Sequence, residues 1–139
     1  MAKIKICGIT RESETEVLNR MRVDYAGFVF FEKSKRNVSI EQAKEIKKHL
    51  KPSIKTVAVT VNPARDLIDE IIEAGFDILQ IHKMQEFPEN LKIPVWVAYQ
   101  VRSREEAEEI NVPDGISGIL LDAPEYGSGK TFSWQGFPM

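Results

Sequence analysis

The stretch Tyr25-Ala-Gly-Phe-Val-Phe30 decides the fold class, because it is nearly all apolar. Such a run is typical of a strand that is buried on both faces, as in a parallel sheet. Further along, Ser39-x-x-Gln42 has the pattern of a capping box and predicts the start of a helix over residues 40–50. A buried strand followed by a capped, charged helix predicts one βα unit.

The same unit recurs along the chain. Apolar or β-branched runs predict six strands, over residues 3–7, 25–30, 55–61, 78–82, 95–101 and 116–122. Helical spacing predicts helices over residues 12–21, 40–50 and 103–110, and a further helix with Pro63 in its first turn that ends at Gly75. Residues 83–94 contain two prolines and leave room for about one helical turn, which is short for a crossover.

Strands that alternate with helices predict an α/β protein with a parallel sheet and right-handed crossovers. A closed (β/α) barrel and an open parallel sheet both fit this order, and periodicity does not choose between them. Six strands suit the open sheet better, since a barrel of the TIM type has eight. In either fold, functional residues are expected at the carboxyl ends of the strands.

Composition excludes several classes of function. The chain has 139 residues, which suits one domain, and its formal net charge of −2 indicates no nucleic-acid or membrane partner. No apolar run approaches the ~20 residues that span a bilayer. The single cysteine excludes an internal disulfide and fits a reducing cytoplasm, and two histidines make a zinc site unexpected. We therefore expect a cytoplasmic protein without a bound metal.

Two residues at predicted strand ends are candidates for acid–base chemistry. Cys7 is either a small buried hydrophobe or a base, and the second interpretation gains from the helix expected near Thr10, whose N-terminus favours a thiolate. Asp122 is either an exposed loop carboxylate or an acid whose pKa is raised by burial. Together they predict a proton-transfer pair across one pocket.

Three further residues are candidates for substrate binding. Arg36 lies in a basic loop that is either simply solvated or holds a carboxylate in the planar fork of the guanidinium. Gln80 and His82 are two residues apart on one predicted strand, so their side chains lie on the same face and both are expected to point inward. A histidine whose hydrogen bonds are satisfied within a core is the commoner outcome. The loop Gly127-Ser-Gly-Lys130 lacks the upstream glycine of a Walker motif and favours a flexible active-site loop.

Five segments in order carry a more specific signal: Lys5-Ile-Cys-Gly-Ile-Thr10, Gly27-Phe-Val-Phe-Phe-Glu-Lys-Ser-Lys-Arg-Asn-Val-Ser39, Val59-Thr-Val-Asn62, Leu79-Gln-Ile-His82, and Leu120-Leu-Asp122 with Tyr126-Gly-Ser-Gly-Lys-Thr-Phe-Ser-Trp134. In sequence and order they resemble the phosphoribosylanthranilate isomerase family of tryptophan biosynthesis. The resemblance covers essentially the whole chain, and it implies a parallel (β/α) barrel of TIM type.

The resemblance also implies a reaction. It is an Amadori rearrangement of N-(5-phosphoribosyl)anthranilate to 1-(2-carboxyphenylamino)-1-deoxyribulose 5-phosphate, without cofactor or metal. Cys7 matches the general base that removes the ribose C2 proton, and Asp122 matches the general acid that protonates the ring oxygen. Arg36 matches the residue that pairs with the anthranilate carboxylate, and His82, with Gln80 beside it, matches a residue of the substrate pocket.

The chain departs from the family pattern in three places: Lys83 replaces a glycine, the fourth helix is short, and the chain ends after the sixth strand. Residues 1–139 are therefore expected to form a single partial (β/α)8-barrel domain, incomplete at about six βα units and lacking the usual phosphate site. Uncovered sheet edges predict a homo-oligomer or a complementing fragment.

Two other functions stay open at this point. One is a catalytically inactive barrel fragment that acts as a folding or assembly module. The other is a different phosphosugar barrel enzyme, such as a pentose-phosphate epimerase, which usually needs a metal or paired acidic bases that this sequence does not offer.

Overall fold

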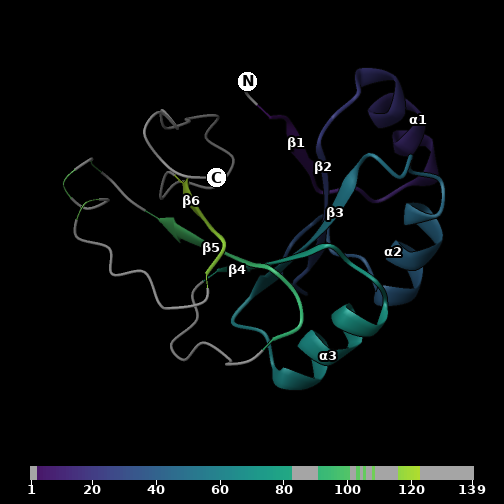
Figure 1. Cartoon of the computed structure of the whole chain (residues 1–139). Helices are drawn as coiled ribbons and strands as arrows, with labels where there is room; N and C mark the ends of the chain where they lie inside the picture. The colour runs from purple at the N-terminus through teal and green to yellow at the C-terminus, as the bar shows by residue number, and fades with distance from the viewer. Residues whose placement is uncertain are drawn as a thin grey trace.

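The computed structural model describes residues 3–82, 91–100, 103, 105, 108 and 116–122. Its elements are β1 (Lys5–Cys7), α1 (Glu12–Met21), β2 (Tyr25–Phe30), α2 (Ile40–Lys47), β3 (Lys55–Val61), α3 (Arg65–Glu73), β4 (Ile78–His82), β5 (Val95–Gln100) and β6 (Gly118–Asp122) (Figure 1). The loop expected over residues 126–134, most of the helix expected over 103–110 and most of the short crossover lie outside the described residues.

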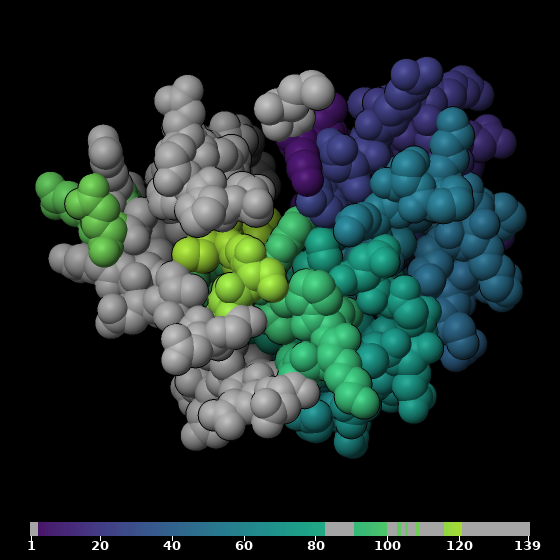
Figure 2. All heavy atoms as spheres, in the orientation of Figure 1, coloured from purple at the N-terminus to yellow at the C-terminus, as the bar shows by residue number. Residues whose placement is uncertain are grey.

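The six strands form one parallel sheet in the order of the chain, β1-β2-β3-β4-β5-β6. In a doubly wound sheet the strand order reverses and helices cover both faces. Here the order never reverses, and α1, α2 and α3 lie together on one side of the strands (Figure 1). In Figure 2 successive units lie side by side around the molecule, from purple through teal to green.

The sheet is strongly curled. The rings of Tyr25 on β2 and Trp96 on β5 meet edge to face with centroids 4.9 Å apart, although three strand spacings separate their strands. Lys5 on β1 donates a hydrogen bond to Gln80 on β4, across the same number of spacings. In a flat sheet those strands would lie about 14 Å apart. The curvature confirms the barrel-type fold and rules out the open sheet.

Curling gives the sheet two separate apolar cores. Side chains alternate between the faces of a strand, so neighbours on β3 belong to different cores. The outer core lies between the sheet and the helices, and there the ring of Phe76 makes edge contacts with Phe28 and Phe30. The concave face holds the second core, formed by Val57, Val59, Ile78, Trp96, Ala98 and Leu120. That the whole chain is a single partial barrel domain stays a prediction.

One helix start differs from the sequence-based expectation, and two agree with it. α3 begins at Arg65 with Ala64 as its N-cap, so Pro63 precedes the helix instead of occupying its first turn. α1 spans Glu12–Met21, the range predicted from helical spacing. α2 begins as predicted, with Ser39 Oγ accepting from the Gln42 N–H at 3.1 Å and Gln42 Oε1 accepting from the Ser39 N–H at 3.0 Å.

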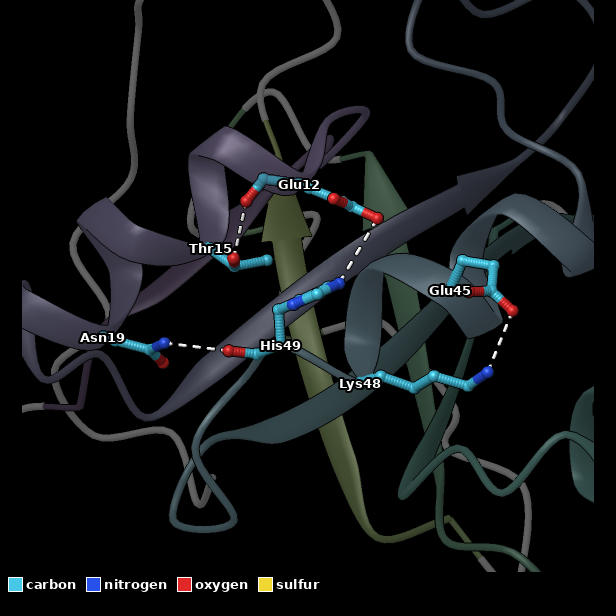
Figure 3. Close-up of polar contacts among 6 residues, drawn as sticks. All are labelled: Glu12, Thr15, Asn19, Glu45, Lys48 and His49. Atoms are coloured by element: carbon cyan, nitrogen blue, oxygen red, sulfur yellow. Dashed lines mark hydrogen bonds and ion pairs between the residues drawn. The ribbon is translucent and has the colours of Figure 1, made fainter.

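The first two helices are joined by side chains at the ends of α1. Asn19 Nδ2 donates to the carbonyl oxygen of His49 at 2.9 Å, and Asn19 Oδ1 accepts from the Lys51 N–H at 3.0 Å. His49 Nε2 lies 3.3 Å from a carboxylate oxygen of Glu12 (Figure 3). These contacts hold neighbouring βα units in register. Within the described residues, no helix is long and apolar enough to cross a membrane.

Candidate active site

Cys7 is exposed at the carboxyl end of β1, the edge at which all six parallel strands end. Its Sγ lies against Gly27 of β2, where an added methyl group would stand only 3.0 Å from the sulfur. Gly8 follows with φ of +88°, a left-handed conformation that a side chain would strain. The N–H groups of Gly8 and Ile9 both donate to the Gly27 carbonyl, at 2.9 and 3.1 Å. The thiol is thus held on a tightly bonded turn.

Arg36 reaches this turn from the loop after β2. Its Nη1 donates to the carbonyl oxygen of Gly8 at 3.4 Å, and its Cγ packs over the Gly8 backbone. The loop is itself anchored, since the Val38 N–H donates to the Val29 carbonyl at 3.0 Å. The structure therefore brings the exposed side chain of Arg36 beside the Cys7 turn.

The N-terminus of α1 is occupied by its own carboxylate. Glu14 Oε1 accepts hydrogen bonds from the backbone N–H and hydroxyl of Thr10 and from the N–H of Arg11, at 3.0 to 3.1 Å. Partial burial acts to raise the pKa of Glu14, but these bonds and the charge of Arg36 together hold that pKa below its usual range. The N–H groups of Thr10 and Arg11, just before α1, are therefore bound by Glu14.

Gln80 and His82 both point to the concave face and are buried, with 3% and 7% of their surfaces exposed. Gln80 Nε2 and His82 Nε2 lie 2.8 Å apart, and Gln80 Oε1 accepts from the ammonium of Lys5. Their strand is fixed on the other side, because Thr60 Oγ1 donates to the Gln80 carbonyl and the Asn62 N–H donates to the His82 carbonyl, both at 2.8 Å. The inward orientation predicted from parity is confirmed.

Asp122 is the last residue of β6, paired in register with Gln100 of β5. The parallel register places its backbone at the same edge as Cys7 and His82. Its side chain lies outside the described part, so its role stays a prediction. Below this edge, the Trp96 indole packs on Gly118 and closes the concave face with an apolar layer.

Sequence reasoning missed two residues of the site, Lys5 and Gly27. Lys5 stands two residues before Cys7, so the alternation of side chains along a strand places both on the same face of β1. This relation can be read from the sequence. Gly27 interrupts an otherwise apolar strand, and a glycine there marks a close approach of a neighbouring group. Within the described ranges, no group of three or more His, Cys, Asp or Glu residues could hold a metal ion.

Comparison with known proteins gives a consistent result. A family model described as N-(5'phosphoribosyl)anthranilate (PRA) isomerase matches residues 4–138. The N-(5'-phosphoribosyl)anthranilate isomerase of Clostridium kluyveri is 38% identical over 139 residues, covering 97% of this chain and 69% of that protein.

Two solved structures are similar in fold and sequence. One is a monomeric form of the dimeric phosphoribosylanthranilate isomerase of Thermotoga maritima, with a TM-score of 0.72 and 32% identity, covering 89% of this chain and 66% of that one. The other is a phosphoribosylanthranilate isomerase in complex with reduced 1-(o-carboxyphenylamino)-1-deoxyribulose 5-phosphate. Its TM-score is 0.67 at 33% identity, covering 78% of this chain and 58% of that one.

Proposed function

The chain belongs to the N-(5'-phosphoribosyl)anthranilate isomerase family, and from that premise we propose that it catalyses the family reaction. The substrate is N-(5-phosphoribosyl)anthranilate and the product is 1-(2-carboxyphenylamino)-1-deoxyribulose 5-phosphate. One of the similar structures holds a reduced form of that product. A cytoplasmic location is part of the same proposal, because the only cysteine is a free thiol and suits a reducing compartment.

Two residues carry the proton transfers in this proposal. Asp122 gives a proton to the furanose ring oxygen as the bond between that oxygen and C1 breaks. The lone pair of the anthranilate nitrogen forms a C1=N bond as the ring opens. Cys7 then takes the proton from C2, the electrons of that C–H bond form a C1=C2 double bond, and the C1=N electrons return to nitrogen. The resulting enol becomes the ketone as C1 gains a proton. An acid and a base on different strands of one rim suit a reaction that needs both.

The observation that carries the proposal is the position of Arg36 over Gly8, next to Cys7. A guanidinium presents paired donors that fit both oxygens of a carboxylate. An anthranilate carboxylate held there would place the attached sugar beside the thiol. His82 and Gln80 complete the proposed pocket from β4, and the apolar layer around Trp96 forms its floor.

The test is the fluorescence change when phosphoribosylanthranilate, generated in situ, meets the parent chain, Cys7→Ala and Asp122→Asn. We expect turnover by the parent that both variants lose by at least about 100-fold, since acid–base groups contribute 10²–10⁴-fold. Asp69→Asn on the exposed side of α3 is the matched control and should keep parent activity. A parent chain with no turnover above the spontaneous background would contradict the proposal and favour an inactive assembly module.

Self-association is a second part of the proposal. Ile4, Val17 and Met21 are the large hydrophobic side chains exposed among the described residues, with 46%, 52% and 54% of their surfaces accessible. All three belong to the first βα unit, whose strand pairs on one side only within the described sheet. Open sheet edges favour pairing with another chain, here a second copy or a complementing fragment. The related Thermotoga enzyme is described as dimeric.

Light scattering at micromolar concentration tests the association. We expect a mass above one chain, and a lower mass for the double variant Val17→Lys, Met21→Lys, because lysine ammonium groups disfavour an apolar contact. The control pair Glu16→Lys and Arg20→Glu, at exposed positions of the same helix, should leave the mass unchanged. A parent mass of one chain would contradict this part.

A further inference from the structure

Three polar residues form a connected chain across the concave face: Lys5, Gln80 and His82. Lys5 and Gln80 come from strands three spacings apart, so the chain exists only because the sheet is curled. Gln80 is the central member, and each end of its amide contacts one of the other two side chains. Both Gln80 and His82 are buried, so the contact between them is shielded from bulk solvent, whereas the contact of Gln80 with Lys5 is partly buried.

The chemistry of lysine fixes the direction of this chain. An ammonium group has three donors and no acceptor, so the atom of Gln80 that faces Lys5 has to be the carbonyl oxygen Oε1. The amide nitrogen Nε2 then faces His82, 2.8 Å from its Nε2. An amide nitrogen only donates, so His82 Nε2 has to accept and carries no proton. The single proton of the neutral imidazole is therefore on Nδ1.

We propose that Lys5 and Gln80 are positioning residues that hold His82 in its Nδ1–H tautomer. The proposal deepens the isomerase function proposed above and rests on it for its catalytic meaning. In this tautomer the Nε2 lone pair is engaged by Gln80, and Nδ1 already bears a proton. With a proton already on Nδ1 and Nε2 bound by Gln80, His82 does not take the C2 proton, which leaves Cys7 as the base.

The backbone of β4 supports the same arrangement. The hydroxyl of Thr60 and the N–H of Asn62 bind the carbonyls of Gln80 and His82, so neither residue of the pair is free to shift along the strand. A histidine whose ring is oriented by a partner is a common way of fixing a tautomer, because the bond at one nitrogen decides the state of the other.

The decisive experiment is two-bond ¹H–¹⁵N correlation NMR on protein labelled in histidine, which shows which ring nitrogen carries the proton. The chain has two histidines, and His49, exposed and beside Glu12, is the internal reference. We expect Nδ1–H for His82 in the parent. Gln80→Glu keeps an oxygen toward Lys5 but places an acceptor against His82, so a proton should move onto Nε2 while the His49 signals stay in place.

A second variant separates anchoring from direct contact. Lys5→Met leaves Gln80 in place but removes the donor that orients its amide, so His82 should lose its single tautomer and show both. Gln42→Glu, in the exposed cap of α2, is the matched control and should leave His82 as Nδ1–H. Each folded variant is compared by its far-ultraviolet circular dichroism before its tautomer is interpreted.

The outcomes separate the tautomer from the activity. A His82 protonated on Nε2 in the parent, or one that does not respond to Gln80→Glu, would overturn the assignment whether or not the chain turns over substrate. In an active parent, Gln80→Glu should also lower kcat/KM by about tenfold or more, as for other residues that orient a functional histidine. An inactive parent with the expected tautomer would contradict the proposed reaction but not the positioning of His82.

Discussion

Replacing Gly27 with alanine tests directly how the candidate base is held. The new methyl carbon would stand 3.0 Å from Cys7 Sγ, 3.2 Å from Cys7 Cα and 3.3 Å from Cys7 Cβ, where ordinary contacts begin at 3.4 Å. Rotation of the Cys7 side chain cannot relieve the contact with Cα, so β1 itself has to move by a few tenths of an ångström. Overpacking of this kind costs about 1–3 kcal/mol of folding free energy.

Part of that cost is offset because alanine has less conformational entropy than glycine in the unfolded chain, which stabilises the folded state by about 0.4–1 kcal/mol. We therefore expect Gly27→Ala to lower the free energy of unfolding in urea by about 1–2 kcal/mol. Displacement of the thiol by a few tenths of an ångström should lower kcat/KM by about tenfold, because a misplacement of 1 Å lowers it by roughly 10²-fold. Because Cys7 is the only cysteine, its reaction rate with a thiol reagent reports the same displacement without substrate.

Gly118→Ala provides a matched control on another strand. Among the described residues, the nearest atoms to its methyl carbon belong to the Trp96 indole, at 2.8 Å for Cδ1 and 2.9 Å for Nε1. The same chemical change should therefore destabilise the fold but leave the reactivity of Cys7 as in the parent. The reasoning is refuted if Gly27→Ala keeps the parent stability and thiol reactivity, or if Gly118→Ala alters thiol reactivity equally.

Two further predictions concern helix starts. Ser39→Ala removes the acceptor for the Gln42 N–H and should lower the free energy of unfolding by about 1 kcal/mol. Urea titration measures this change, and a change of less than a few tenths of a kcal/mol would argue against the cap. Glu14 has a pKa held below that of the unfolded chain, so its contribution is present above the ordinary glutamate pKa and is lost as pH falls through the lower folded value. Glu14→Gln should therefore reduce stability at neutral pH and flatten the acid limb of the stability profile, and an unchanged acid limb would contradict this.

The sequence predicts strands better than it predicts the curvature of the sheet. β2, β3 and β4 have the bounds expected from their apolar runs, because a buried parallel strand needs no other signal. Barrel and open sheet share those runs, and the choice depends on contacts such as Tyr25 with Trp96 between distant strands. The family resemblance indicated the barrel, whereas strand count alone favoured the open sheet.

The sequence predicted which residues belong to the site better than it predicted the contacts between them. The position of Cys7 at a strand end follows from periodicity, but the packing of Arg36 over Gly8 joins residues 28 positions apart. The sequence analysis did not predict that Glu14 accepts from the N–H groups of Thr10 and Arg11. Lys5 was not predicted as a site residue, because a lysine within a strand is usually assigned to a solvated face. Its position two residues before Cys7 nevertheless places it on the same face of the strand.

The chain-order pairing of the sheet has a consequence for synthesis on the ribosome. Each strand from β2 to β6 pairs with the strand made just before it, so the pairing edge it needs has already emerged when it appears. Translation delivers about 5–20 residues per second, which is slow beside the microseconds in which short segments close. The described sheet is therefore suited to vectorial, co-translational growth, in which each new unit docks on a finished template and no strand waits for a distant partner.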